Sequence, residues 1–336
     1  RSPSRGLGDV YKRQVISWCK PYIRLAVNST MKFQPISKWL PNAAKPLIIA
    51  GPCSAESEVQ IMQVAETLSE AGSVQLLRAG VWKPRTRPNS FEGMGKNALP
   101  WLIKAEKEFG IPFVIEVANE EHVKAALDAG ISHVWIGART TVNPFSVQEI
   151  ADALEGSNIP VFVKNPLNPD LQLWIGAIER LNAAGLEKLA AIHRGFSTYE
   201  KRAYRNSPNW EIPIELKTQF PELEIIVDPS HIGGDRSVLR EISQKALDLG
   251  FDGLMIETHP NPDEALSDPK QQIFLHEFEA FISELEEKQP HFKDRIAKNQ
   301  LEQLRKLIDD TDHGLSESLK HRQEIVTQNG DYKAEH

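Results

Sequence analysis

Six basic residues lie at or just after the ends of short apolar runs in the middle of the chain. They are Arg78, Lys83, Arg85, Arg139, Lys164 and Arg194. An Arg side chain can bind a phosphate or a carboxylate through two parallel hydrogen bonds, and a Lys side chain supplies a compact positive charge. Any one of them alone could equally belong to a solvated surface. As a set, in a chain whose formal net charge is −7, they predict a site for phosphorylated substrates.

A second group has the residue types that bind transition metals. Cys53, His231, Glu257 and Asp268 offer sulfur, nitrogen and oxygen donors, which suit one divalent ion such as Mn²⁺, Fe²⁺, Zn²⁺ or Co²⁺. An ion with an open position could polarise a substrate carbonyl. Because the four residues are widely spaced, they could also be a buried Cys, a capping His and two surface carboxylates. The choice depends on whether the fold brings them together.

Eight short apolar runs rich in β-forming residues could supply such a fold. They cover residues 47–50, 75–78, 112–117, 133–137, 160–164, 188–193, 224–228 and 253–257. Amphipathic segments with a helical repeat lie between them, and several of these end at a Gly. This alternation predicts an α/β fold, the (β/α)₈ TIM barrel, rather than an open doubly wound sheet, since no GxGxxG motif follows the first run. The carboxyl ends of all strands in a barrel meet at one face, where both groups of residues would gather.

After Asp268 the pattern changes, and we predict a C-terminal α-helical extension. Residues 270–289 are expected to form one amphipathic helix that Pro290 ends, and residues 299–332 show a second helical repeat. We therefore divide the chain into three parts. Residues 1–30 are a non-native or disordered leader, residues 31–289 form the barrel, and residues 290–336 contain a linker and a helical segment.

Composition excludes several classes of protein. The negative net charge gives no support for a nucleic-acid partner. No apolar run reaches the 18 or more residues expected of a membrane-spanning helix, so we expect no membrane association. The two cysteines, Cys19 and Cys53, are too few for a disulfide framework and are consistent with a reducing, cytoplasmic location.

Eight motifs, in order along the chain, resemble those of the 3-deoxy-D-arabino-heptulosonate 7-phosphate (DAHP) synthase family, in its compact microbial type I form. They are GPCSAES (51–57), KPRTRP (83–88), IGART (136–140), KN (164–165), HRG (193–195), DPSHIGG (228–234), IETH (256–259) and ALSD (265–268). The resemblance runs from about Leu47 to Gln272. It implies a transferase of the shikimate pathway to aromatic amino acids. Such an enzyme condenses phosphoenolpyruvate with erythrose 4-phosphate and water, giving DAHP and phosphate.

The resemblance also implies a role for each group. Cys53, His231, Glu257 and Asp268 would bind the metal ion. Phosphoenolpyruvate would be held through its phosphate and its carboxylate, and erythrose 4-phosphate would bind beside it. The phosphate contacts would be Arg139, Arg194 and the backbone of Ala138; the carboxylate contacts Arg78, Lys83 and Lys164; and the erythrose 4-phosphate contacts Pro84, Arg85 and Thr86. Glu116 and Lys83 are the candidates for proton transfer.

The tail carries a separate resemblance. Residues 301–333 resemble the first helix of the all-helical chorismate mutase family, with Arg305, Arg322 and Lys333 at the positions of its substrate-binding cations. The alternative is a surface helix with incidental basic residues. The later helices of that family have no counterpart here, and Ser316 and Ser318 replace residues that are usually apolar. We therefore expect an incomplete mutase domain without mutase activity, attached to a barrel that forms a homo-oligomer.

Three other functions stay open. The sister enzyme 3-deoxy-D-manno-octulosonate 8-phosphate synthase uses the same barrel and the same enol donor, but its family carries a KANR-type sequence in place of KPRT (83–86). A Schiff-base aldolase would use Lys164 as its nucleophile. A non-catalytic binding protein would have no use for an intact set of four ligands and six cations.

Overall fold

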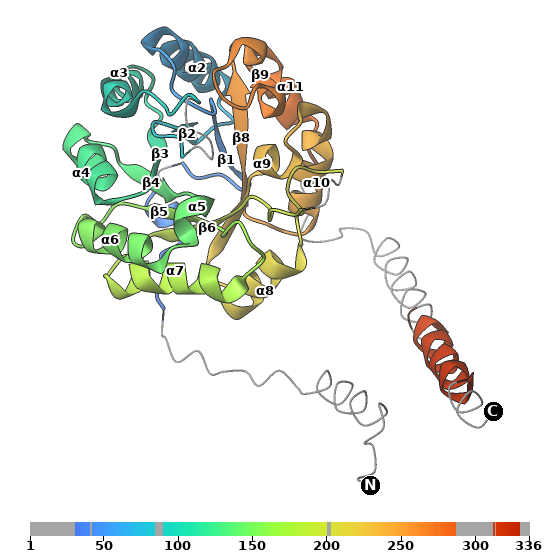
Figure 1. Cartoon of the computed structure of the whole chain (residues 1–336). Helices are drawn as coiled ribbons and strands as arrows, with labels where there is room; N and C mark the ends of the chain where they lie inside the picture. Colours follow the sequence, from blue (N-terminus) through green and yellow to red (C-terminus); the bar gives the residue numbers. More distant parts are fainter. Residues whose placement is uncertain are drawn as a thin grey trace, which may run out of the picture. The chain divides into compact units, whose positions relative to one another are not determined.

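The computed structural model describes residues 31–40, 42–84, 90–199, 203–286, 312 and 314–329. Its central element is a closed barrel of eight parallel strands, which Figure 1 shows surrounded by helices. The strands are β1 (Leu47–Gly51), β2 (Leu76–Ala79), β3 (Phe113–Val117), β4 (His133–Ile136), β5 (Val161–Lys164), β6 (Leu189–His193), β7 (Glu224–Val227) and β8 (Gly253–His259). Each strand pairs with the next, and β1 closes the ring on β8, with Gly51 opposite Glu257. The predicted TIM barrel is confirmed, and all eight predicted runs are strands.

Helices alternate with the strands and form the outer layer of the barrel (Figure 1). They are α2 (Glu58–Ala71), α3 (Leu99–Phe109), α4 (Glu120–Ala129), α5 (Ala138–Thr141), α6 (Pro144–Leu154), α7 (Leu171–Ala183), α8 (Glu211–Gln219), α9 (Pro229–Gly233), α10 (Leu239–Asp248) and α11 (Phe278–Ser283). Polar side chains cap several of these helices, as when Asn119 Oδ1 accepts a hydrogen bond from the backbone N–H of His122 at 2.9 Å. Such caps explain why the helices begin immediately after the loops that carry the site.

The barrel interior is apolar toward the amino-terminal ends of the strands. Inward-facing residues form a cluster that includes Leu76, Val114, Trp135, Phe162 and Met255. A short N-terminal segment closes this end, because Ile36 and Leu40 pack into the same cluster and the Trp39 ring lies 5.7 Å from the Phe162 ring. The interior is therefore a packed core and leaves the opposite end of the strands for chemistry.

One predicted helix is wrong. In place of a single helix over residues 270–289, the chain forms a 3₁₀ turn (Pro269–Gln271), a short strand β9 (Ile273–Phe274), a second 3₁₀ turn (Leu275–Glu277) and then α11. The reason is tertiary: β9 pairs with β8, and the side chains of Gln271 and Gln272 are buried. A helical repeat in the sequence does not outweigh these contacts. Residues 287–289 lie outside the described residues.

The described part of the tail is helical. Residues 314–329 form a helix, in agreement with the repeat predicted over residues 299–332, whose other residues apart from 312 lie outside the described part. All residues of this helix are exposed, among them Leu315, Leu319, Ile325 and Val326. Contacts within the chain separate this segment from the barrel after Glu286. In the described residues no helix is both long and apolar enough to span a bilayer.

Candidate active site

The functional side chains form the layer directly above the apolar interior. Side chains alternate along a strand, so the residue two positions after an inward-facing apolar residue also points inward, one step nearer the carboxyl end. By this rule Leu76 leads to Arg78, Val114 to Glu116, Phe162 to Lys164 and Met255 to Glu257; Ile226 likewise leads to Asp228 just past β7. Alternation in the strands thus changes a hydrophobic layer into a charged one within two residues.

Buried charges of both signs meet in this layer. Arg78 Nη2 lies 2.9 Å from Glu257 Oε1, and Lys164 Nζ lies 2.8 Å from Asp228 Oδ2. Both cations lie near the indole ring of Trp135, at 5.2 and 5.3 Å from its centroid. The four charged side chains are between 0 and 5% exposed. Burial of this kind is tolerated only where charges are paired. Arg78, Glu257, Lys164 and Asp228 therefore form a buried charge network in which each side chain depends on its partner.

The buried charge network keeps the carboxylates of Asp228 and Glu257 ionised. Although burial works to raise it, the pKa of Asp228 lies well below its usual range because of His231, Lys164 and Arg78. Burial opposes ionisation of Glu257 in the same way, and the charge of Arg78 still holds its pKa below the usual value. Burial lowers the pKa of Lys164, and the nearby Asp228 counters that effect. Both carboxylates are therefore available as anions at neutral pH.

The four predicted metal ligands come together at one side of this buried charge network. Cys53 follows β1, His231 lies in α9, Glu257 lies in β8, and Asp268 follows β8 in the loop to β9. Cys53 Sγ lies 3.5 Å from Asp268 Oδ2, and His231 Nδ1 lies 3.9 Å from Glu257 Oε1. The described residues contain no group of three such side chains already arranged around one ion. The residues are neighbours, and coordination would need small side-chain movements.

The chemistry of this donor set fits a divalent ion. His231 Nδ1 and Glu257 Oε1 are buried without an aligned hydrogen bond among the described residues. Their nearest charged neighbours are Asp228 Oδ2, 2.8 Å from the imidazole nitrogen, and Arg78 Nη2, 2.9 Å from the carboxylate oxygen. Burial and then the charge of Glu257 raise the pKa of the Cys53 thiol to about 12, which disfavours a thiolate in the absence of a strong cation. A bound metal ion supplies such a cation and lowers the pKa of a coordinating thiol. These residues therefore fit a metal ion.

Lys83 and Glu116 lie at a polar cavity of about 60 Å³ over this layer, with His231 and Asp268 among its lining residues. Lys83 Nζ is 3.1 Å from Cys53 Sγ and also donates to the backbone carbonyl of Cys53. Glu116 Oε2 accepts a hydrogen bond from the indole N–H of Trp135 at 3.2 Å. Both groups predicted to transfer protons thus line the same cavity as His231 and Asp268, two of the four predicted metal ligands.

The predicted phosphate contacts line the same cavity from β4 and β6. Ala138 and Arg139 open α5, and Arg139 is exposed. Arg194 follows β6 and is 7% exposed, and its guanidinium donates to Asn206 Oδ1 at 3.0 Å. Burial lowers the pKa of Arg194 to about 10, so its guanidinium stays charged at neutral pH. Two arginines therefore line one cavity, Arg194 buried and Arg139 exposed.

Not every predicted site residue can be placed. Pro84 lines the cavity, whereas Arg85 and Thr86 lie outside the described residues, as do Arg305 and Lys333 of the tail. Arg322 lies in the exposed helix 314–329.

Comparison with known proteins gives the family of the barrel. The sequence model of the DAHP synthetase I family matches residues 40–294. The chain belongs to this family. The phospho-2-dehydro-3-deoxyheptonate aldolase of Thermotoga maritima is 36% identical over 239 residues, which are 71% of this chain and 68% of that protein. The 2-dehydro-3-deoxyphosphooctonate aldolase of Rhodopseudomonas palustris is 29% identical over 269 residues, covering 73% of this chain and 88% of its own length.

Solved structures agree with this membership of the DAHP synthetase I family. The crystal structure of the Thermotoga maritima DAHP synthase superposes with a TM-score of 0.67 and 31% identity, covering 75% of this chain and 72% of that one. A truncated form of the same enzyme gives a TM-score of 0.62, also at 31% identity, over 71% of this chain and 84% of its own. The family match ends at residue 294, before the predicted mutase-like segment.

Sequence reasoning missed several residues that the structure places in the site. In the sequence Asp228 is only one residue of the DPSHIGG motif, yet it contacts Lys164 and His231. Arg205 lies 2.9 Å from Asp268, and Trp135 lies beneath two cations. An inward position just past a strand end could have indicated Asp228. No pattern in the sequence links Arg205 to Asp268, 63 residues away.

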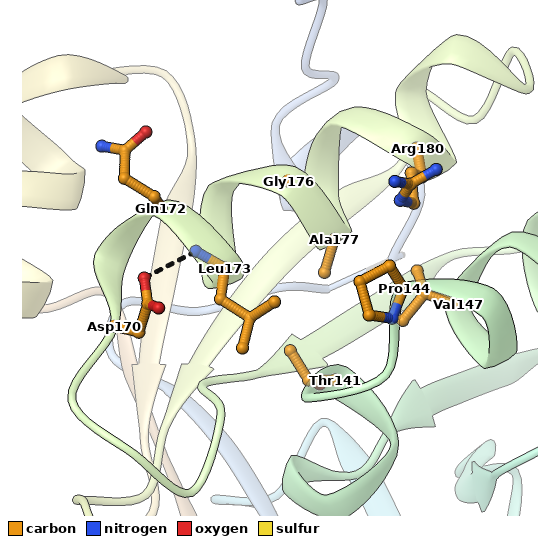
Figure 2. A pocket seen from close by; sticks show the side chains of 9 residues that line it. All are labelled: Thr141, Pro144, Val147, Asp170, Gln172, Leu173, Gly176, Ala177 and Arg180. Carbon is orange, nitrogen blue, oxygen red and sulfur yellow. Dashed lines mark hydrogen bonds between the residues drawn. The ribbon is translucent and has the colours of Figure 1, made fainter.

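A larger groove of about 320 Å³ lies elsewhere, between α6 and α7 (Figure 2). Pro144, Val147, Leu173 and Ala177 give it a mainly apolar lining, and Figure 2 shows Asp170 at its edge accepting the hydrogen bond that caps α7. None of the predicted site residues lines it. We therefore assign the chemistry of the DAHP synthetase I fold to the smaller polar cavity.

Proposed function

We propose that this chain is a DAHP synthase, which condenses phosphoenolpyruvate with erythrose 4-phosphate and water to give DAHP and phosphate. The observation that carries this proposal is the meeting of two groups of residues at one cavity. Four of the six predicted cations (Lys83, Arg139, Lys164 and Arg194) line this cavity together with His231 and Asp268. Cys53 lies beside Asp268, Glu257 beside His231, and Arg78 beside Glu257. Such a site suits two phosphorylated substrates and one polarised carbonyl.

The cations divide naturally into a carboxylate part and a phosphate part. Nε and Nη1 of Arg78 are buried without a hydrogen-bond partner among the described residues, which leaves two donors for a substrate carboxylate. Lys164 also lies over the Trp135 ring, at 5.3 Å from its centroid, and adds a second positive charge. Arg139 and Arg194, which line the cavity, would then hold the phosphate with the backbone N–H of Ala138. The enol carbon of phosphoenolpyruvate would then lie between the carboxylate contacts and the phosphate contacts.

The metal ligands determine where the aldehyde would lie. Cys53, His231, Glu257 and Asp268 would hold one divalent ion, which when bound supplies Lewis-acid polarisation of the erythrose 4-phosphate carbonyl. Pro84, with Arg85 and Thr86, would hold the sugar phosphate chain. The aldehyde carbon would then face C3 of phosphoenolpyruvate, which is the bond-forming pair of the reaction.

Proton transfer falls to the two groups that face the cavity with their charged ends. Carbon–carbon bond formation leaves an alkoxide that needs a proton, and addition of water at C2 releases one before phosphate departs. Lys83 Nζ, beside Cys53, is placed to protonate the alkoxide. Glu116, oriented by the indole N–H of Trp135, is placed to accept the proton of the water. Each transfer of this kind is worth about 10²–10⁴-fold in rate.

Competition between two aldehyde substrates tests this function. Purified protein would receive phosphoenolpyruvate with equal concentrations of erythrose 4-phosphate and arabinose 5-phosphate, and both products would be quantified by mass spectrometry. We expect the seven-carbon product to dominate. Dominance of the eight-carbon product would assign the chain to the octulosonate enzymes, of which the 29% identical Rhodopseudomonas palustris protein is one. Covalent trapping of Lys164 by borohydride would instead indicate a Schiff-base aldolase.

We also propose that the chain consists of a barrel domain over residues 31–289, after a leader at residues 1–30, and then a linker and a mutase-like helix over residues 290–336. The support is the resemblance of residues 301–333 to the first chorismate mutase helix together with the observed helix 314–329. We expect no conversion of chorismate to prephenate by this chain. Measurable turnover in a coupled absorbance assay would contradict that expectation.

A homo-oligomer is the final part of the proposal. Phe145 is 83% exposed on the first turn of α6, and in the sequence it stands between Pro144 and Val147, which line the groove. An exposed aromatic side chain beside an apolar groove is typical of a surface that another protein copy covers. Light scattering after size exclusion should give a multiple of the chain mass, and Phe145→Ser should lower it. A monomeric native protein would contradict this.

A further inference from the structure

Arg205, in the loop between β6 and α8, contacts one proposed metal ligand directly and is linked to a second through Gln271. Its Nη1 donates to Asp268 Oδ1 at 2.9 Å and to Gln271 Oε1 at 2.8 Å. Gln271 Nε2 in turn donates to Glu257 Oε2 at 2.7 Å. One guanidinium group therefore reaches Asp268 directly and Glu257 through a single buried amide.

The next residue, Asn206, contacts two further parts of the site. Its side-chain Nδ2 donates to the backbone carbonyl of His231 at 2.6 Å, and its Oδ1 accepts from Arg194 Nη1 at 3.0 Å. Asn206 is 4% exposed, so neither contact has much competition from water. Through this amide the α9 turn that carries His231 is joined to Arg194.

The backbone holds these two side chains in place. Arg205 N–H donates to Gly233 O at 3.1 Å, and Asn206 N–H donates to Ile232 O at 3.0 Å. Gly234 has a φ of +71°, and a Cβ atom there would lie 2.5 Å from Cβ of Arg205. Glycine at position 234 is therefore what allows the 205–206 segment to lie against α9.

We propose that Arg205 and Asn206 are positioning residues for the metal-ligand set, and that Asn206 joins this set to the phosphate-binding Arg194. The inference rests on the proposed function, because it assumes that these ligands hold an ion. Groups that orient metal ligands usually change metal affinity by about 10–100-fold when they are removed. The same segment would also align the two substrates, since it contacts both the metal ligands and the phosphate site.

Charge alone would act in the opposite direction. Arg205 carries a positive charge near the ion, so its removal would tighten metal binding if electrostatic repulsion were its only effect. If Arg205 positions the metal ligands, removal of its side chain should weaken binding of the metal ion. A replacement of similar length should restore part of the metal affinity. The sign of the change therefore separates the two explanations.

The test is a titration of the metal-free full chain with Co²⁺, followed by its thiolate absorption band, for Arg205→Ala, Arg205→Gln and Arg205→Lys. Arg240→Ala is the matched control, because Arg240 also pairs with one carboxylate, Glu284, at 3.2 Å. We expect the dissociation constant for Co²⁺ to rise about 10–100-fold for Ala and Gln and less for Lys, with the control unchanged. Unchanged or tighter binding by the Ala and Gln variants would overturn the proposal.

Asn206 gives a second, separable readout. With Co²⁺ at saturation, Arg205→Ala should change the KM for phosphoenolpyruvate less than twofold, whereas Asn206→Ala should raise it about tenfold. Asn206→Asp keeps an acceptor for Arg194 but loses the donor to His231, so it should weaken Co²⁺ binding more than it raises KM. If wild-type protein binds Co²⁺ and turns over substrate while these variants match it, this inference alone fails. If wild-type protein neither binds the ion nor makes product, the proposed function itself fails.

Discussion

Replacement of Asp228 by Asn should destabilise the whole barrel, because this carboxylate is the anion on which two buried cations depend. Its Oδ2 lies 2.8 Å from Lys164 Nζ and 4.0 Å from Arg78 Nη1, and Asp228 is fully buried. The amide keeps the size of the side chain and removes its charge. Breaking a buried pair by removing one partner costs about 3–5 kcal/mol, since the other charge is left without compensation.

The loss should be visible in both stability and activity. For a barrel of this size, 3–5 kcal/mol corresponds to a fall in Tm of roughly 6–20 °C. The substitution also removes the partner that holds Lys164 in its charged form, so binding of phosphoenolpyruvate should weaken. Thermal unfolding followed by circular dichroism, together with the KM for phosphoenolpyruvate, measures both effects.

Asp263→Asn provides the matched control for this experiment. Asp263 pairs with Arg236 at 2.8 Å, but its side chain is 69% exposed. Exposed ion pairs contribute about 0–1 kcal/mol, so the control should shift Tm by a few degrees at most. If the Asp228→Asn and Asp263→Asn proteins unfold at the same temperature, the buried charge network does not stabilise the fold as we propose.

Two further predictions follow from burial and from close contact. Burial and the positive charge of Lys188 lower the pKa of His133 to about 4, so the unfolded chain takes up a proton before the folded chain does, and stability falls as pH drops from 6.5 to 4. His133→Asn should remove about 3 kcal/mol of this acid sensitivity in urea unfolding measured at both pH values, and parallel curves for the two proteins would contradict it. A Cβ atom at Gly137 would lie 2.0 Å from Glu116 Oε1, so Gly137→Ala should displace that carboxylate and lower kcat about 10²-fold or more. Gly176→Ala, with no heavy atom within 4 Å of the added carbon, is its control and should keep full activity.

The fold and much of the site were predictable because their signals are local or periodic. Each strand is a short apolar run between turn residues, and inward positions two residues apart explain why Arg78, Glu116, Lys164 and Glu257 share one layer. The cations at the strand ends then follow from the barrel itself. For this reason the layer could be anticipated without knowing a single distance.

The remaining features depend on contacts between distant segments. Gln271 and Gln272 look like ordinary polar residues of a helix, yet one binds Glu257 and the other accepts a hydrogen bond from the backbone N–H of Cys53 at 2.9 Å. These bonds, with the β8–β9 pairing, overrule the helical repeat predicted there. The sequence does not indicate the role of Arg205 for the same reason, since its partner Asp268 lies in a different loop.

Metal dependence of the condensation tests the central claim most directly. Phosphoenolpyruvate consumption in the presence of erythrose 4-phosphate would be followed before chelation, after chelation, and during stepwise return of Mn²⁺ to the wild type and to Cys53→Ala. We predict that chelation abolishes turnover, that about one equivalent of ion restores it in the wild type, and that the Cys53→Ala protein stays inactive. Full turnover by the chelated wild type, or full recovery by Cys53→Ala, would contradict a single ion held by these four residues.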